Sequence, residues 1–229
     1  MLGESSVSPH LETVSTVHAL ERALEKRVLD GQFRPGEHLR EIELSREYEV
    51  GRNTLRAAFD ALVGRGILMK AQNRGVFIRV LTERDLADIY ELRAALEVQA
   101  ARTLAARRAV PADARDALAR ELGLDEDSPH RSRIEADLAF HHAVVTGAGN
   151  TRMTRAYEDL ASEIRLCLGQ LVGEWATLRL LATEHEQILA AIGSGRPAMA
   201  EAAVRHHLAG ARARLVTRSA AGGRAPAAN

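Results

Sequence analysis

The sequence predicts a mainly α-helical fold in which a winged helix-turn-helix, with three helices and a β-hairpin wing, precedes an all-α helical bundle. Apolar residues recur at helical spacing along most of the chain of 229 residues. The exception is a pair of short β-type runs on either side of a Gly-containing turn at residues 72–75. Aromatic residues make up only 3% of the chain, while Ala and Leu are abundant, which favours cores of helix packed on helix.

The first 80 residues contain the elements of the winged helix-turn-helix. Residues 1–13 lack periodicity and are expected to form a flexible N-terminus, so the domain spans residues 14–80. Its second helix is predicted to bury Ile42 and Leu44. We expect helices over residues 14–29, 41–48 and 53–65, then β-type runs over residues 67–70 and 76–80. Three helices with a tight turn between the second and third, followed by a hairpin, describe this fold.

From residue 82 onward only helical periodicity remains. Thr82 and Asp85 form a capping pair at the start of a long helix. We expect one all-helical domain over residues 82–217, with helices over 82–107, 111–122, 131–147, 151–172, 174–194 and 196–217. The tail, residues 218–229, is rich in small residues, Gly and Pro and is predicted to be disordered.

Charge is unevenly distributed along the chain. The formal net charge is zero, with 31 Lys and Arg against 31 Asp and Glu. Between Val50 and Val80, however, Asp60 is the only acid. The basic residues of that segment are Arg52, Arg56, Arg65, Lys70, Arg74 and Arg79. Such a local surplus is typical of a module that faces the phosphates of nucleic acid.

The composition also excludes several classes of protein. Cys167 is the only cysteine, which rules out an intrachain disulfide and argues against a Cys-based zinc site. Nothing resembles a signal peptide, and no apolar stretch approaches the roughly 18 residues of a membrane span. We therefore expect a cytoplasmic protein without a membrane partner.

The third helix of the winged domain carries the residue types that read DNA. In a helix-turn-helix this helix lies in the major groove, and its N-terminal residues meet base edges. Arg52 and Arg56 share one face, because they are four residues apart. Arg pairs bidentately with guanine, as Asn53 can with adenine, and Thr54 can bind phosphate. The alternative is that both arginines belong only to the solvated face of an amphipathic helix.

The turn of the predicted wing offers a second DNA contact. Arg74 and Gly75 stand at its tip. An arginine there suits the DNA backbone or the minor groove, and a glycine permits a close approach. We expect both residues to belong to the DNA-binding surface.

Four residues of the helical domain have the chemistry of a metal site. Asp137 and His141 are four residues apart on one helix, so both side chains point the same way. His185 and His207 come from two later helices. Three imidazoles and a carboxylate suit Zn²⁺, Ni²⁺ or another transition-metal ion. The alternative for each histidine alone is a hydrogen-bonded core residue.

Helical phase separates two pairs of neighbouring histidines. His141 falls among apolar residues of its helix, whereas His142 falls on the polar face. Likewise His207 lies alongside Val204 and several alanines, whereas His206 faces away. The phase therefore selects His141 and His207 as the inward-facing members.

Three segments of the first domain resemble the winged-helix signature of the GntR family, namely residues 29–39, 50–56 and 62–68. The resemblance implies a DNA-binding homodimer that recognises a palindromic operator. One departure is Ala57, which stands where many members carry Glu. That difference affects the details of the expected operator contact.

The helical domain resembles the FCD subgroup of the same family, on residues 137–141, 147–150, 184–188 and 207–208. The resemblance implies an all-α effector domain with a metal held by one Asp and three His. Arg93 matches an arginine that faces the cavity and pairs with a ligand carboxylate. Its alternative is a surface or interdomain salt bridge with one of the nearby acids. Asn150 is a further effector candidate, with capping of the following helix as its alternative.

Together these features predict a transcriptional regulator whose operator affinity is controlled by a small carboxylate effector bound beside a metal. A repressor that responds to the metal itself uses the same residues and remains an alternative. A metal-dependent hydrolase fused to a DNA-binding head is a weaker alternative, because no general base stands out among the inward residues. We therefore expect that the protein is not an enzyme.

Overall fold

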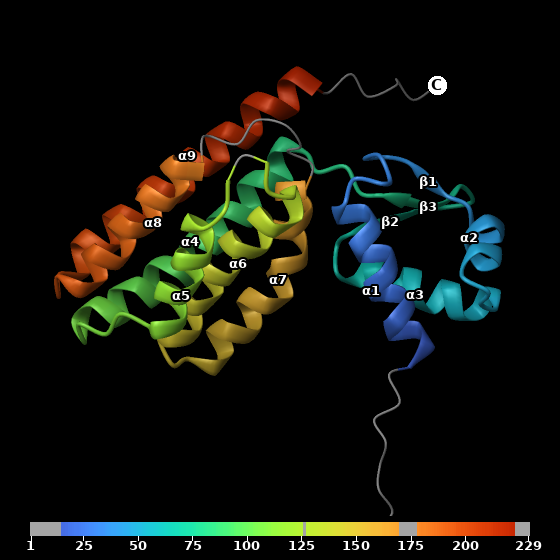
Figure 1. Ribbon diagram of the computed structural model, residues 1–229. Coiled ribbons are helices and arrows are strands. Elements are labelled where there is room, and N and C mark those ends of the chain that lie inside the picture. Colours follow the sequence, from blue (N-terminus) through green and yellow to red (C-terminus); the bar gives the residue numbers. More distant parts are fainter. Residues whose placement is uncertain (1–14, 126, 170–177, 223–229) are drawn as a thin grey trace, which may run out of the picture.

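The computed structural model describes residues 15–125, 127–169 and 178–222, which form two parts (Figure 1). A part made of helices and a small sheet lies beside a bundle of helices, and the chain crosses between them near residue 80. The mainly α-helical fold predicted from the sequence is confirmed. None of the described helices is both long and apolar enough to span a membrane.

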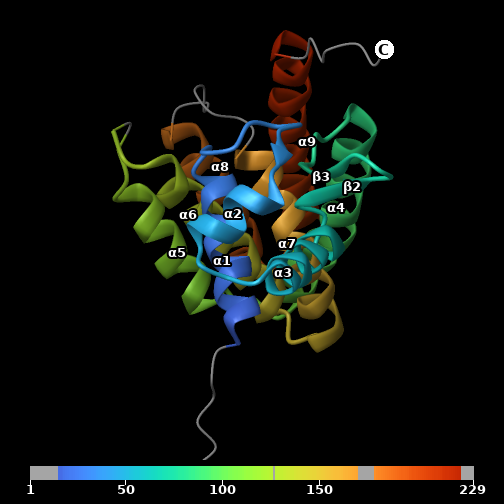
Figure 2. The ribbon, with the colours of Figure 1, turned by 90° about the vertical axis from the view of Figure 1, so that its right-hand side faces the viewer.

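The N-terminal part is a winged helix-turn-helix. Its elements are α1 (Thr16–Leu29), β1 (His38–Leu39), α2 (Glu41–Glu47), α3 (Arg52–Gly64), β2 (Leu68–Ala71) and β3 (Gly75–Ile78). In the sheet, β3 lies in the centre and pairs antiparallel with β1 and with β2. Figure 2 views the molecule from this part, with α2, α3 and the β2–β3 hairpin in front of the bundle.

Two details of the winged part differ from the sequence prediction. Strand β1 is not predicted, because two residues are too few to show a period; its Leu39 is buried and pairs with Val76. Ile42, predicted to be buried, is 49% exposed. Helix α2 turns Leu44 to the core, and positions two apart on a helix point in roughly opposite directions.

The C-terminal part is a bundle of helices. They are α4 (Glu83–Ala106), α5 (Ala112–Leu122), α6 (His130–Gly147), α7 (Thr151–Gly169), α8 (Leu178–Gly193) and α9 (Pro197–Gly222). The predicted capping pair is present before α4: Thr82 Oγ accepts from the Asp85 N–H at 3.1 Å, and Asp85 accepts from the Thr82 N–H at 2.8 Å. Helix α9 lies along α4.

The predicted end of the last helix at residue 217 is wrong, because α9 continues to Gly222. Its last turns are rich in alanine, which has the highest helix propensity of the amino acids. Residues 223–229 of the predicted tail and residues 1–13 of the predicted N-terminus lie outside the described residues. The same holds for 170–172 and 174–177, where helix was also expected.

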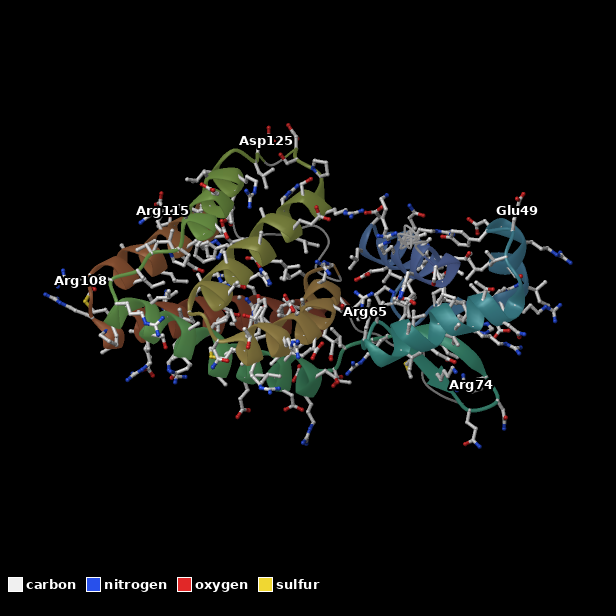
Figure 3. All side chains as sticks on the ribbon, turned by 90° about the horizontal axis from the view of Figure 1, so that it is seen from below. Glu49, Arg65, Arg74, Arg108, Arg115 and Asp125 are labelled. Atoms are coloured by element: carbon white, nitrogen blue, oxygen red, sulfur yellow. The ribbon has the colours of Figure 1, made fainter. Side chains whose placement is uncertain are left out.

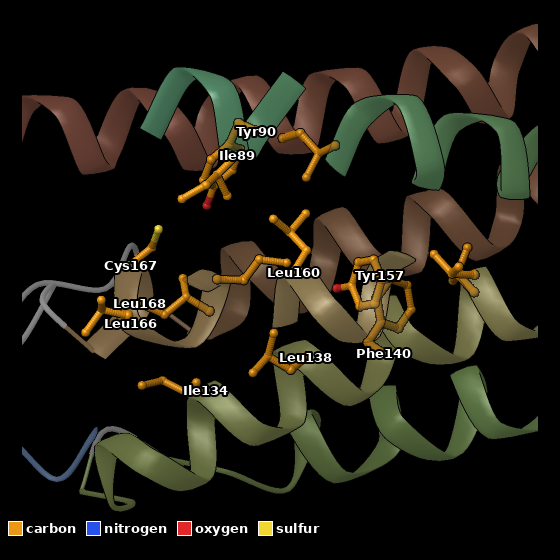
Figure 4. Packing of buried hydrophobic residues seen from close by; sticks show 14 of the residues in the cluster. Ile89, Tyr90, Ile134, Leu138, Phe140, Tyr157, Leu160, Leu166, Cys167 and Leu168 are labelled. Atoms are coloured by element: carbon orange, nitrogen blue, oxygen red, sulfur yellow. The ribbon is translucent and has the colours of Figure 1, made fainter. Parts of the chain in front are cut away.

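Side chains from α4, α6 and α7 meet in the apolar core of the bundle (Figure 4). Helix α6 contributes Leu138 and Phe140, α7 contributes Tyr157 and Leu160, and α4 contributes Tyr90. All five are buried. Because this packing fixes the rotation of each helix about its axis, it decides which polar side chains point inward.

Helix α7 contacts both ends of the β2–β3 hairpin. Arg65, which directly follows α3, donates to Ser162 Oγ on α7 at 2.7 Å from Nη2. Arg79, which follows β3, donates from Nη1 to Glu163 at 3.0 Å and from Nη2 to Asp85 at 2.6 Å. Figure 3 shows Arg65 between the two parts of the molecule. The helical bundle thus holds the base of the wing through two neighbouring residues of one helix.

Candidate DNA-reading surface and metal centre

The first turn of α3 is an exposed edge of the winged part. Leu55 is fully buried and anchors the turn, which leaves Arg52, Asn53 and Arg56 exposed and Thr54 half-buried. Within the described residues, the Arg52 side chain makes no hydrogen bond or ion pair. The structure therefore brings these four predicted residues together on one accessible turn, from which base edges can be reached.

Arg56 differs from Arg52 in having a partner. Its Nε lies 2.9 Å from Oε2 of Glu41 at the start of α2, and the Arg56 side chain is 58% exposed. An ion pair this exposed is weak, because water screens it. Arg56 can therefore exchange Glu41 for a base or a phosphate, whereas Arg52 has no internal contact to give up.

The wing tip carries Arg74 and Gly75 as the sequence predicts. Arg74 is exposed, and Figure 3 shows it at the outer end of the hairpin. Gly75 has φ = 101°, and a Cβ there would lie 2.4 Å from Nε2 of His38. The glycine is thus favoured by the hairpin itself, because its backbone conformation is one that residues with a side chain rarely adopt.

The basic residues of the segment 50–80 lie in two separate regions of the molecule. Arg52 and Arg74 are exposed at the recognition turn and the wing. Arg65 and Arg79 instead contact α7 at the junction of the two parts. The positive charge available to DNA is therefore smaller than the sequence count suggests.

The predicted metal ligands converge inside the bundle. Asp137 and His141 come from α6, His185 from α8 and His207 from α9, and each is at most 4% exposed. One ligand atom from each of the four lies within 4.8 Å of the others. The adjacent histidines turn outward as predicted: His142 is half-buried at the surface and His206 is exposed.

Each imidazole is held by a glutamate through Nδ1. His141 lies 2.7 Å from Glu97 on α4, His185 lies 2.6 Å from Glu121 on α5, and His207 lies 2.6 Å from Glu184 on α8. All three glutamates are buried. An ionised carboxylate can only accept, so each Nδ1 carries the proton and donates it. Each Nε2 is then left with a lone pair that faces the centre of the cluster.

The electrostatics keep Glu97 and Asp137 ionised and His207 neutral. Burial would raise the pKa of Glu97, but the Arg93 guanidinium and His141 lower it. Burial also opposes ionisation of Asp137, yet the neighbouring histidines and Arg93 bring its pKa below the ordinary value. Burial lowers the pKa of His207 to about 4, against the raising effect of its bond to Glu184. His207 is therefore neutral at pH 7, the form that binds metals.

The three Nε2 atoms have the spacing of ligands that share an ion. The Nε2 of His141 lies 3.3 Å from that of His185 and 3.1 Å from that of His207. A tetrahedral ion about 2.1 Å from each imidazole nitrogen spaces its ligand atoms roughly 3.4 Å apart. Asp137 Oδ1 lies 3.8 Å from the Nε2 atoms of His141 and His185. Because lone pairs repel at this distance, the donor set fits a cation at its centre.

Arg93 lies beside this cluster and is 1% exposed. Its Nε donates to Glu97 Oε1 at 2.8 Å, and the other oxygen of Glu97 accepts from His141. Its Nη2 is buried without a hydrogen-bond partner. Arg93 therefore faces the interior of the bundle, and its salt bridge is with Glu97 of its own helix rather than at the surface or between the two domains. Pairing with an effector carboxylate stays a prediction.

Asn150 is not part of the cluster. It is exposed, and its side-chain oxygen accepts from the N–H groups of Arg152 and Met153 at 3.0 and 3.2 Å. It therefore caps α7, the alternative that the sequence left open. It also lines a surface pocket with Gln99 and Thr103, on the outside of the bundle.

Sequence reasoning missed the glutamates that orient the histidines. Glu97, Glu121 and Glu184 are not predicted as site residues, because charged helical residues are usually solvated. Helical phase could have found two of them. Glu121 follows Ala117 by four residues, and Glu97 follows Arg93 by four, each on the apolar face of its helix.

The fold and the cluster define a class of protein: a DNA-binding winged helix joined to a helical domain with an internal polar site. Residues 16–78 match the family described as "Bacterial regulatory proteins, gntR family", and residues 88–210 match the FCD domain. The chain belongs to the GntR family of bacterial transcriptional regulators and carries an FCD domain. It is a transcriptional regulator, and the prediction that it is not an enzyme is confirmed.

Relatives and solved structures agree with this assignment. The chain is 34% identical over 160 residues to the Nta operon transcriptional regulator of Aminobacter aminovorans, covering 68% of this chain and 73% of that one. It is 29% identical to the "Probable D-xylose utilization operon transcriptional repressor" of Paenarthrobacter nicotinovorans, over 80% of each. A GntR regulator from Rhodococcus sp. RHA1 has the same fold, with a TM-score of 0.76, 24% identity and coverage of 88% and 97%.

Proposed function

We propose that this regulator binds a palindromic operator as a homodimer and that a small carboxylate, bound beside a divalent metal, controls its DNA affinity. The two-fold symmetry of a dimer matches a palindromic site, in which each recognition helix reads one half. The proposed DNA contacts are Arg52, Asn53, Thr54 and Arg56 on α3, and Arg74 and Gly75 on the wing. The operon regulators among its relatives support control of an operon.

One observation carries the metal proposal: three buried Nε2 lone pairs converge while each Nδ1 is bound to a buried glutamate. Without a cation, this arrangement would bury unsatisfied lone pairs at considerable cost. Asp137, His141, His185 and His207 would hold the ion. Imidazole and carboxylate ligands favour Zn²⁺, with Ni²⁺ as the next choice. The bound metal would supply a positive centre for an oxygen of the effector.

Arg93 is the residue proposed to bind the effector carboxylate. Its guanidinium is buried near the cluster and has a free Nη2. A buried guanidinium with an N–H that has no partner favours a further anionic acceptor. Asn150 takes no part in this proposal, because its carboxamide oxygen is occupied in capping α7.

The test uses His207→Ala beside His206→Ala, a matched pair of adjacent residues with the same side chain removed. Both proteins and the wild type would be analysed for bound metal. Each would then be used to select binding sites from random DNA duplexes. We expect one metal ion per chain in the wild type and in His206→Ala, and little or none in His207→Ala. The selected wild-type sites should be palindromic.

The same proteins separate effector control from direct metal control. Operator affinity would be measured with zinc alone, with a chelator, and with zinc plus a set of carboxylates. A change only on adding a carboxylate supports the proposal. A change between zinc and chelator alone supports a metal-responsive repressor instead. Equal metal content in all three proteins would contradict the metal centre.

A further inference from the structure

An acidic side chain lies at the edge of the proposed DNA-reading turn. Glu41 is the first residue of α2, and its Oε2 accepts a hydrogen bond from Nε of Arg56, on α3, at 2.9 Å. The Arg56 side chain is 58% exposed and that of Glu41 is 30% exposed. An acid beside a DNA-reading arginine repels the phosphates of any duplex, so its presence at this edge requires an explanation.

The fold fixes the position of Glu41 relative to α3. Helices α2 and α3 contact each other, and both lie in the part that faces the viewer in Figure 2. Each buries a leucine in the apolar core, Leu44 from α2 and Leu55 from α3. Within the described residues, Arg56 is the only cation with which Glu41 forms an ion pair. The carboxylate is therefore supplied to Arg56 by a neighbouring helix whose placement does not depend on DNA.

The ion pair engages only one of the three guanidinium nitrogens. Nε of Arg56 donates to Glu41, whereas Nη1 and Nη2 have no partner within the described part of the chain. Two terminal nitrogens form the fork with which an arginine binds O6 and N7 of guanine in the major groove. Arg56 can thus bind a base without releasing Glu41. A duplex that covers the pair would also exclude water, which strengthens the attraction between the two charges.

Arg52 provides the contrast within the same turn. It is exposed, and its side chain makes no hydrogen bond or ion pair among the residues that the structure describes. A free arginine samples many directions and loses that freedom when it binds, whereas an arginine that is already held loses less. The held side chain also presents its fork in fewer directions. Of the two arginines, Arg56 is therefore the one whose aim the protein itself restricts.

We propose that Glu41 is a positioning residue for DNA recognition: it stays bound to Nε of Arg56 on the operator and directs the two terminal nitrogens to one guanine. The proposal rests on the proposed function, because it assumes that Arg56 contacts a base. The charge of Glu41 weakens binding to every duplex alike, but its hold on Arg56 helps only where the guanine is present, so it increases specificity. The competing behaviour is that Arg56 exchanges Glu41 for a phosphate.

The test uses Glu41→Ala beside Glu43→Ala, which removes the same charge from the same helix. Glu43 pairs with Arg40 at 3.1 Å, and both of these side chains are exposed. Sites would first be selected from random duplexes with the wild type and with Arg56→Ala. The position at which Arg56→Ala loses a preference for guanine identifies the base. Affinities would then be measured for duplexes with guanine or adenine at that position and for a random duplex.

We expect Glu41→Ala to lose about tenfold of the preference for guanine over adenine, which is near the lower end of what a bidentate contact supplies. Its affinity for the random duplex should rise, because a negative charge near the phosphates is removed. Glu43→Ala should keep the full preference. Both variants should melt close to the wild type, since exposed ion pairs contribute little to stability. Adding Glu41→Ala to Arg56→Ala should change the preference no further.

Four results would overturn the positioning role. An unchanged preference in Glu41→Ala would show that Arg56 releases Glu41 on DNA, and the proposed function would stand. An equal loss in Glu43→Ala would assign the effect to charge alone. A further loss in the double variant would mean that Glu41 reads a base itself. If Arg56→Ala keeps every preference of the wild type, the proposed base contact of Arg56 fails, and the positioning role fails with it.

Discussion

The helical domain and the winged part hold their functional side chains in opposite ways. In the helical domain, His141, His185 and His207 are buried, and a buried glutamate orients each ring. In the winged part, Arg52 and Arg74 are exposed. A small ion brings no structure of its own, so the protein must build its site in advance. DNA is large and rigid enough to fix the geometry of exposed side chains on contact. The side chains that contact DNA can therefore remain solvent-exposed until it binds.

This comparison predicts that the buried site contributes strongly to stability and the exposed one hardly at all. The largest effect is expected for His141→Ala. The variant should lose its metal and become about 4 kcal/mol less stable where zinc is about a thousandfold above its dissociation constant. Metal analysis and thermal melts with zinc measure both. His142→Ala is the control, since its ring is half-exposed beside Glu158. Equal losses in the two variants would mean that helix α6, not the metal, sets the stability.

Arg52→Ala should have the opposite profile. Loss of a bidentate base contact costs about 1–3 kcal/mol of DNA binding, or roughly ten- to a hundredfold in affinity. The melting temperature should hardly change, because the exposed Arg52 side chain makes no hydrogen bond or ion pair within the described residues. Titration of the selected operator and of a random duplex measures affinity and specificity. Arg84→Ala, an exposed arginine on α4, is the control. A loss of affinity that is equal on both duplexes would assign Arg52 to phosphate rather than to a base.

Glu121→Gln tests whether the glutamates are part of the metal site. The amide keeps the size of the side chain but removes the charge that holds His185 through Nδ1. Loss of such an outer partner lowers metal affinity by about ten- to a hundredfold, and the retained carbonyl places this variant near the lower figure. Competition with a zinc indicator measures the affinity. Unchanged affinity would show that the apolar packing around His185 is enough to orient the ring.

The sequence predicts the inward histidines but not the groups that orient them. Phase alone separates His141 from His142, because an apolar face is visible in any helix of sufficient length. Glu97 and Glu121 lie on similar faces, yet a single buried acid becomes interpretable only when its partner on another helix is known. Pairing between helices far apart in the sequence is a property of the tertiary fold, which local periodicity does not contain. For the same reason, the sequence does not predict that Arg65 and Arg79 contact helix α7 while the other basic residues of this segment face DNA.

The junction of the two parts contains an ion pair between helix α7 and the wing, and its removal is expected to have the smallest effect on stability. Glu163 on α7 binds Arg79 at the end of the wing, and both side chains are 27% exposed. Glu163→Gln should therefore cost only about 0.5 kcal/mol of stability. Helix α7 also packs against α6, which carries two of the proposed metal ligands. Zinc should then slow hydrogen exchange of wing amides in the wild type, and this slowing should weaken in Glu163→Gln.

Glu158→Gln is the matched control for this experiment, because it removes the same charge from the same helix but at a surface pair with His142. It should retain the full effect of zinc on the wing. If zinc protects the wing equally in all three proteins, the signal crosses by another contact, such as the packing of α1 against α7. If only Glu163→Gln loses the protection, a weak and partly exposed ion pair carries the coupling. Its energetic cost to the fold would then be small, while its effect on communication between the two parts would be large.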